Sequence, residues 1–163
     1  MRSYLLGRLA FHAAGFALVL LASGCDHGLA PPDEPQTGTI SARVRYLQDA
    51  DSWPPRQAIF DLRFVAMRFV PQDTSDFLQL NRLVFSDSLR HGVSEDVAIV
   101  SDVEVGPFLY SGVAWKYGPN LFDWRPVGLV ESNGGVFIVH PDETTFVEVD
   151  ADFVNYPHFP PQN

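Results

Sequence analysis

Histidines are the first residues to consider for acid–base or metal chemistry, and four follow residue 25: His27, His91, His140 and His158. His91 and His140 stand beside glycine and proline, in segments typical of solvated turns. Ser94, Asp102 and His140 supply the residue types of a hydrolase triad, but a chain of this length offers such triples by chance. Phosphate-binding loops and the His-Glu-x-x-His and Gly-x-Ser-x-Gly motifs are absent from the sequence. We therefore predict that the protein is not an enzyme.

Carboxylates could instead bind a cation such as Ca²⁺ through their oxygens. The candidates are Asp142 and Glu143 in a turn, and Glu148, Asp150 and Asp152 along one strand face. Neither group has the spacing of a known calcium loop. Three carboxylates in a row repel one another unless cationic side chains on the neighbouring strand offset them, as Arg43 and Arg45 would. We expect a solvated, partly paired sheet face, and we predict no metal and no cofactor.

Aromatic side chains are the remaining candidates for binding. Trp53 lies in a loop with two prolines, Trp115 and Tyr117 lie near the end of an aromatic-rich strand, and Trp124 opens the next strand. Such side chains stack on sugar rings or anchor a protein partner. They more often cap a core, because tryptophan is large and seldom fully exposed. These four residues form the possible binding surface, with residues 117–124 at its centre.

The first 24 residues differ in composition from the rest of the chain. Their only Lys or Arg residues are Arg2 and Arg8, and all 20 acidic residues follow residue 25. An apolar run of 13 residues, from Leu9 to Leu21, precedes a small-residue segment. This order is typical of a secretory signal peptide, removed from the mature protein. A membrane-spanning helix is the weaker interpretation, because it needs about 20 apolar residues.

Cys25 is the only cysteine, and it follows Leu21-Ala22-Ser23-Gly24 directly. These residues resemble the lipobox of a bacterial lipoprotein, although Ala22 departs from the leucine most common at its position. The resemblance implies that the Cys25 thiol receives a diacylglyceryl group, that residues 1–24 are removed and that the new amino terminus is acylated. Two or three acyl chains would hold the protein on a membrane of the bacterial cell envelope, facing the periplasm or the cell surface. The alternative is a buried cysteine in an ordinary secreted protein.

Removal of the signal peptide would leave 139 residues. Because Arg2 and Arg8 leave with it, the formal net charge would change from −9 to −11. This acidic balance lacks the basic footprint of a nucleic-acid-binding protein. Residues 25–37 contain three prolines and three acids, which predicts a flexible tether behind the lipidated N-terminus.

From Gly38 onward, short apolar alternations between turn residues predict strands rather than helices. The expected strands cover residues 39–47, 58–70 with a bulge near Ala66, 77–85, 97–105, 108–117, 124–131, 136–139 and 144–154. Residues 132–135, Ser-Asn-Gly-Gly, are the strongest tight-turn signal, so residues 136–139 should pair back onto 124–131. Seven or eight strands within residues 38–155 predict an all-β, antiparallel sandwich of the immunoglobulin-like or prealbumin-like kind. A Pro-rich tail, expected to be frayed, follows at 156–163.

The order of these features resembles the carboxypeptidase regulatory-like group of prealbumin-like (transthyretin-like) sandwiches. The resemblance rests on the opening strand 38–44, the Trp-Pro-Pro break at 53–55, the turn at 105–110 and the closing strand 145–150. Gly106-Pro107 inverts the Pro-Gly order of that group, and Phe108 intervenes. The resemblance implies a structural or binding module and no chemistry by itself.

Together these features predict a lipid-anchored sandwich of the cell envelope, acting as a non-catalytic accessory or partner-binding module. Its expected partners are the membrane, through the N-terminal lipid, and an envelope protein or glycan; nucleic acid is not among them. The alternative is a carbohydrate-binding module that uses Trp53, Trp115 or Trp124.

Overall fold

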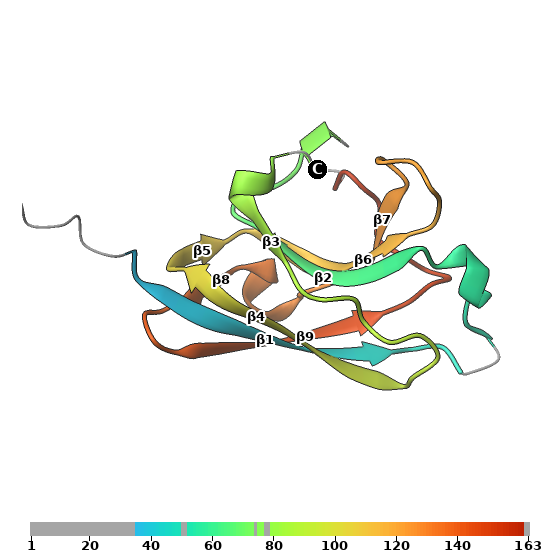
Figure 1. Ribbon diagram of the computed structural model, residues 1–163, viewed down its shortest axis with the longest axis horizontal. Helices are drawn as coiled ribbons and strands as arrows, with labels where there is room; N and C mark the ends of the chain where they lie inside the picture. The colour runs from blue at the N-terminus through green and yellow to red at the C-terminus, as the bar shows by residue number, and fades with distance from the viewer. Residues whose placement is uncertain (1–34, 50–51, 74, 77–78, 162–163) are drawn as a thin grey trace, which may run out of the picture. The chain divides into compact units, whose positions relative to one another are not determined.

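The computed structural model describes residues 35–49, 52–73, 75–76 and 79–161. The predicted signal peptide, Cys25 and the tether up to residue 34 lie outside this range. The described chain forms nine strands in sheets of three, four and two strands, which confirms the all-β sandwich (Figure 1). Within these ranges the helices are short 3-10 turns, and none has the length and apolar character needed to cross a membrane.

The first sheet has the strand order β4-β1-β9. Its strands are β1 (Thr37–Tyr46), β4 (Glu95–Glu104) and β9 (Thr144–Ala151). Alternate residues of β1, from Ile40 to Tyr46, are buried, as the period of two predicts. β4 pairs with β1 antiparallel, whereas β9 pairs with it parallel. The predicted antiparallel sandwich is thus confirmed with one parallel pair, in which β9 occupies the edge of β1 that β4 leaves free.

The second sheet lies over the first and has the order β3-β2-β6-β7, with every neighbouring pair antiparallel (Figure 1). Its strands are β2 (Asp61–Met67), β3 (Leu83–Phe85), β6 (Tyr110–Lys116) and β7 (Trp124–Leu129). Leu62, Phe64 and Ala66 of β2 point into one core cluster shared with Ile40 and Val44 of the first sheet. Burial of such side chains is the main favourable term in folding.

The predicted bulge near Ala66 was wrong. β2 pairs with β6 in unbroken register from Asp61 to Met67. The apolar pattern changes sides there because Met67 belongs to a second apolar cluster, with Phe69 and Leu83, on the outer face of the sheet. The strands expected at 58–70 and 77–85 are also shorter than predicted. The 3-10 helix η2 (Arg56–Ala58) ends at the first residue of the one, and β2 runs only from Asp61 to Met67. The 3-10 helix η4 (Leu80–Arg82) lies within the other, and residues 77–78 lie outside the described ranges.

A third, small sheet pairs β5 (Gly106–Phe108) with β8 (Phe137–Val139). The prediction that residues 136–139 pair with 124–131 was therefore wrong. The preceding turn forms the 3-10 helix η5 (Ser132–Gly135), with positive φ angles of 52° at Asn133 and 66° at Gly134. Val130, just after β7, bridges to β9 instead, so β8 is left to pair with β5.

β7 packs directly on β9 and closes one side of the sandwich. A Cβ atom at Gly128 would lie 2.2 Å from the backbone oxygen of Asp150, so only glycine permits this approach. The N–H of Asp152 donates to the carbonyl of Val127 over 2.6 Å. These contacts place the hairpin formed by β6 and β7 against the end of β9.

The described domain has two distinct ends. Thr37 opens β1 at one end, close to the turn at Asp142, whose N–H donates to the Thr37 carbonyl. β9 runs parallel to β1, and β4 antiparallel to it, so residues near Ala151 and Glu95 lie at the other end. We call this second end the distal end; segments 47–49, 52–60, 88–94, 117–123 and 152–156 meet there. The C-terminal tail also packs on the domain, with Phe159 against Tyr110.

Candidate functional site

Trp53 is part of the core. Its side chain is 8% exposed, and its ring contacts Tyr46, Phe153 and His91 with centroid separations of 4.6, 4.8 and 5.0 Å. The Nε2 atom of His91 lies 3.0 Å from the Pro54 carbonyl and helps to hold this loop. Of the two roles considered for Trp53, the structure shows core capping, and its ring is not presented to solvent.

The other three predicted binding residues come together on the hairpin of β6 and β7. Trp115 is half-buried; its Nε1–H donates to the Ala58 carbonyl over 3.0 Å, and its edge meets Phe153. Tyr117 is 37% exposed and lies 6.1 Å from Trp115, centroid to centroid. Trp124 is half-buried, and the Nζ of Lys116 lies 5.9 Å from its ring centroid. These three residues therefore share one end of the domain.

Arg125 is the central residue of this group, and it is not among the residues predicted from the sequence. Its Cζ lies 3.9 Å from the ring centroid of Tyr117, 4.9 Å from that of Tyr156 and 5.2 Å from that of Trp115. Its Nη1 donates to the Tyr156 hydroxyl over 2.8 Å. Trp115 and Arg125 are paired across the hairpin, and aligning the two strands around the turn would have revealed this neighbour. Tyr156 comes from the tail, and no local pattern places it here.

The guanidinium of Arg125 is held by rings and not by a carboxylate. In the part of the chain that the structure describes, the arginines with acidic partners are Arg43, Arg45, Arg63 and Arg90. The Nε of Arg125 is buried and has no acceptor among the same residues. Lys116 and Arg56 at the same end likewise form no ion pair with a described carboxylate.

The acidic residues closest to the hairpin hold loop backbone instead. Asp123 accepts from the N–H of Asn120 over 2.8 Å. Asp152 accepts from the N–H groups of Val154 and Asn155 over 2.7 and 3.0 Å, and these bonds lower the pKa of its carboxyl group. Asp152 therefore caps the segment after β9. The sequence grouped Asp152 with Glu148 and Asp150 in one acidic row, but its carboxylate bonds to backbone N–H groups and not to the arginines of β1.

Large apolar side chains are also exposed at the distal end. Leu121 and Phe122 at the hairpin tip are 61% and 50% exposed. Phe60, whose N–H donates to the Lys116 carbonyl, is 55% exposed. We define the distal patch as Phe60, Lys116, Tyr117, Leu121, Phe122, Trp124, Arg125 and Tyr156. Lys116 and Trp124 pair with each other one position along from Trp115 and Arg125, so their side chains point to the opposite face of the hairpin. Exposed apolar groups at the same end of a domain as a stacked arginine are typical of a region that binds a partner.

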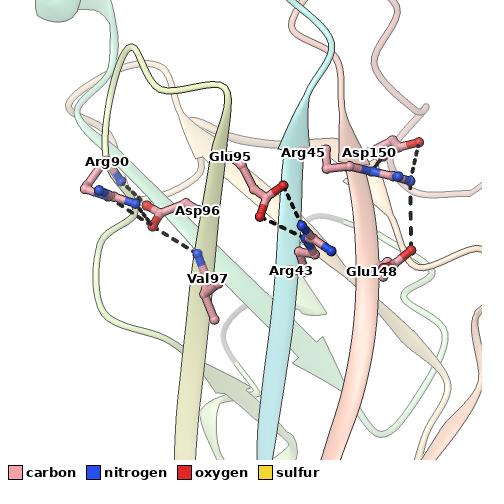
Figure 2. Close-up of polar contacts among 8 residues, drawn as sticks. All are labelled: Arg43, Arg45, Arg90, Glu95, Asp96, Val97, Glu148 and Asp150. Carbon is pink, nitrogen blue, oxygen red and sulfur yellow. Dashed lines mark hydrogen bonds and ion pairs between the residues drawn. The ribbon is translucent and has the colours of Figure 1, made fainter.

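The acidic row on the outer face of the first sheet is paired, as the sequence predicted (Figure 2). Arg45 binds Asp150 over 2.7 Å and approaches Glu148 to 3.9 Å. Arg43 turns the other way and binds Glu95 on β4 over 2.8 Å. No group of three potential metal ligands occurs among the described side chains. This face is an exposed ladder of ion pairs, each of which contributes little stability.

A more buried ion pair joins Arg90 to Asp96 at the distal end (Figure 2). Burial of Asp96 disfavours its charged form, but hydrogen bonds from the Arg90 side chain and from the N–H groups of Arg90 and Val97 outweigh burial. The pKa of Asp96 is therefore lowered. All the hydrogen bonds of the Asp96 carboxylate go to Arg90 and Val97, which are close in the sequence. Asp96 therefore has a structural role, because it holds the loop that precedes β4.

The triad considered from the sequence is not assembled. The Ser94 carbonyl accepts from the N–H of Tyr46 at the distal end of β1. The backbone oxygen of His140 lies beside Gly38, near the start of β1. A serine at one end of a ten-residue strand and a histidine at the other are too far apart for proton transfer.

A shallow hollow lies on the outer face of the second sheet. Its lining is apolar and comes from Val65, Met67, Tyr110, Gly112, Val113, Ala114, Pro126 and Leu129. Small residues on β6 leave this space, and the lining offers no charged group to direct a ligand. The distal patch, which combines charge, aromatic rings and exposure, is the stronger candidate site.

No known protein family, curated protein or solved structure matches this chain.

Proposed function

We propose that the protein is a lipid-anchored module of the bacterial cell envelope that binds a partner protein through its distal patch. The observation that carries the proposal is the placement of the patch at the far end of β1 from Thr37. A chain anchored at Cys25 would reach the domain at Thr37, and the patch lies at the other end of β1, where the point of entry does not cover it. The similarity to the carboxypeptidase regulatory-like group agrees with a binding module and stays a prediction.

The chemistry of the patch favours a protein over a glycan. Tyrosine, tryptophan and arginine carry most of the binding energy in protein interfaces. Sugars stack on open ring faces, whereas Arg125 covers one face of Tyr117 and Lys116 lies over Trp124. Leu121, the more exposed of the two large apolar residues at the hairpin tip, gives an apolar contact suited to a protein side chain.

The anchor is tested by replacing Cys25 with alanine in a bacterial host fed labelled palmitate. We expect the wild-type chain to take up label and to fractionate with membranes. The Cys25→Ala chain should lose both properties, because no other thiol is present to accept a lipid. Label retained by the variant would refute the lipoprotein assignment.

The binding role is tested by site-specific photo-crosslinking in intact cells. A photoreactive phenylalanine analogue is placed at Phe122 in the patch or at Phe85 on β3, which are 50% and 49% exposed. We expect one discrete protein adduct from position 122 and none from position 85. Identical products from the two positions would refute a specific interface. Tryptophan quenching by envelope glycans, without any adduct at position 122, would favour the carbohydrate-binding alternative.

A further inference from the structure

The charge of Arg125 has no counter-ion within the described domain. One of its terminal nitrogens donates to Tyr156, and its Nε is buried without an acceptor among the described residues. A guanidinium has five N–H donors, so most of its hydrogen-bonding capacity is unused. The bond to Tyr156 lies at the surface, so the remaining terminal N–H groups of Arg125 are open to an acceptor outside the domain.

Arg68 provides an internal comparison, because it too lies over a ring. Its Cζ is 4.5 Å from the Phe108 centroid, and both terminal nitrogens donate to backbone carbonyls, those of Glu104 and Val105. The side chain of Arg68 therefore joins the chain just after β2 to the segment between β4 and β5, and both of its terminal nitrogens have acceptors within the domain. Arg125 has the same stacked geometry and holds the tail through Tyr156, but it lacks those carbonyl acceptors, so its other terminal nitrogen has no acceptor among the described residues.

The surroundings of Arg125 suit a planar anion. Tyr117, Tyr156 and Trp115 hold the guanidinium in one orientation, and they exclude water from its faces. A fixed guanidinium binds a carboxylate through two parallel hydrogen bonds, which is stronger and more specific than a single one. Arg56, which also forms no ion pair with a described carboxylate, adds positive charge at this end of an otherwise acidic chain and complements an acidic ligand.

From this geometry we propose that Arg125 receives the carboxylate of an aspartate or glutamate side chain of the partner protein. Apolar residues beside that carboxylate pack on Leu121 and Phe122, which lie exposed at the same hairpin. The acidic group gives specificity, and the apolar contacts exclude water around the ion pair. This inference rests on the proposed function and names the chemistry that its distal patch recognises.

The test uses two short peptides that differ in one group. The full chain, isotope-labelled and held in detergent, is titrated with acetyl-Phe-Asp-Leu-amide or with acetyl-Phe-Asn-Leu-amide. Arginine Nε–Hε signals are followed by NMR, with Arg82 as the internal control, because it lies over Phe69 and bonds Gln79 far from the patch. We expect the aspartate peptide to shift the Arg125 signal in a saturable way, at least tenfold more tightly than the asparagine peptide, with Arg82 unmoved.

Arg125→Lys keeps the charge and loses the planar fork, and we expect it to weaken the aspartate peptide about tenfold while leaving the asparagine peptide unchanged. Equal affinity for the two peptides would overturn the carboxylate assignment and leave the distal patch as an apolar binding surface. No response of Arg125 to either peptide would also overturn it, and the crosslinking at Phe122 then decides separately whether the patch binds a protein.

Discussion

Arg125 lies over the ring of Tyr117 with its Cζ 3.9 Å from the ring centroid, and the two residues stand on neighbouring segments of the β6–β7 hairpin. The contact holds a cation in place without neutralising it. Most other arginines in the described domain meet carboxylates or carbonyl oxygens. Those arginines use their charge to stabilise the domain, whereas the charge of Arg125 remains available to bind a ligand.

Arg125→Met should leave stability nearly unchanged, because methionine keeps the apolar stem and removes the charge. The cation–π contacts contribute about 0.5–2 kcal/mol, and a buried donor without an acceptor costs about 1–3 kcal/mol. We therefore expect a change in the free energy of unfolding of less than about 1 kcal/mol. Urea unfolding followed by tryptophan fluorescence measures it. A loss above about 3 kcal/mol would show that Arg125 is mainly structural.

Asp96→Asn should destabilise the domain at neutral pH and reduce its acid sensitivity. Asp96 is nearly buried, and its bonds to Arg90 and Val97 lower its pKa in the folded state. The stabilisation is present above the unfolded-state pKa of about 3.9. It is lost as the pH falls through the lower folded-state value.

We expect Asp96→Asn to cost about 2–4 kcal/mol at neutral pH, since charge-assisted hydrogen bonds are weakened. The loss should shrink below about pH 4. Unfolding curves measured from about pH 2 to about pH 7 give both quantities. Replacement of the exposed Asp87 by asparagine is the matched control. A pH dependence identical in the two variants would contradict the role assigned to Asp96.

Gly128→Ala should be strongly destabilising. The added Cβ would meet the Asp150 oxygen at 2.2 Å and the Ala151 Cα at 2.9 Å, and backbone atoms of a paired strand have little room to move. We expect a loss of about 3 kcal/mol or more. Gly92→Ala is the control, because its Cβ would meet nothing within 4 Å and only the positive φ of 74° opposes it.

For Gly92→Ala the expected cost is about 1–2 kcal/mol, the penalty of a left-handed backbone for alanine. Thermal unfolding of both variants gives the comparison. If Gly128→Ala were no more destabilising than Gly92→Ala, the close packing of β7 on β9 would be wrong.

Tyr110→Phe should be neutral or stabilising. The hydroxyl of Tyr110 is buried and has no partner among the described residues, and burial raises its pKa to about 12. Removing it relieves a desolvation cost of about 1 kcal/mol or more. Because the raised pKa stabilises the fold only below the unfolded value of about 10, wild-type stability should fall as the pH rises above about 10.

The Tyr110→Phe variant should lose less stability than wild type in that alkaline range, which urea unfolding at about pH 9 and about pH 11 tests. Tyr156→Phe is the contrasting variant, because its exposed hydroxyl accepts from Arg125. A destabilisation by Tyr110→Phe larger than about 1 kcal/mol would mean that its hydroxyl has a partner.

Several features were predictable from the sequence because their causes are local. Alternation of apolar and polar residues in 39–47 predicts β1 and its buried face, since side chains of a strand point to opposite sides in turn. The same period placed Glu148 and Asp150 on an outer face, where Arg45 now binds both. The acidic balance and the segment around Cys25 are likewise properties of composition and order.

Other features depended on the tertiary structure, because they join residues that no local pattern connects. Parallel pairing of β1 and β9 joins residues about a hundred positions apart, as Arg45 and Asp150 show with a separation of 105. The loop position of Trp53 left both core capping and a binding role open, and packing by Tyr46 and Phe153 buries its ring. Hydrophobic burial has no direction along the chain, so which loop covers the core is decided by the assembled sheets.

Arg125 shows most clearly which features the sequence alone could not predict. The sequence alone determined that a cation follows Trp124 in a predicted strand. Only the fold brought in Tyr156, which is 31 residues away, and left the guanidinium without a carboxylate in the described domain. The residue type determines the charge of a side chain, but neighbours in space determine its counter-ions and its burial. Counter-ions and burial in turn set the strength of its electrostatic interactions.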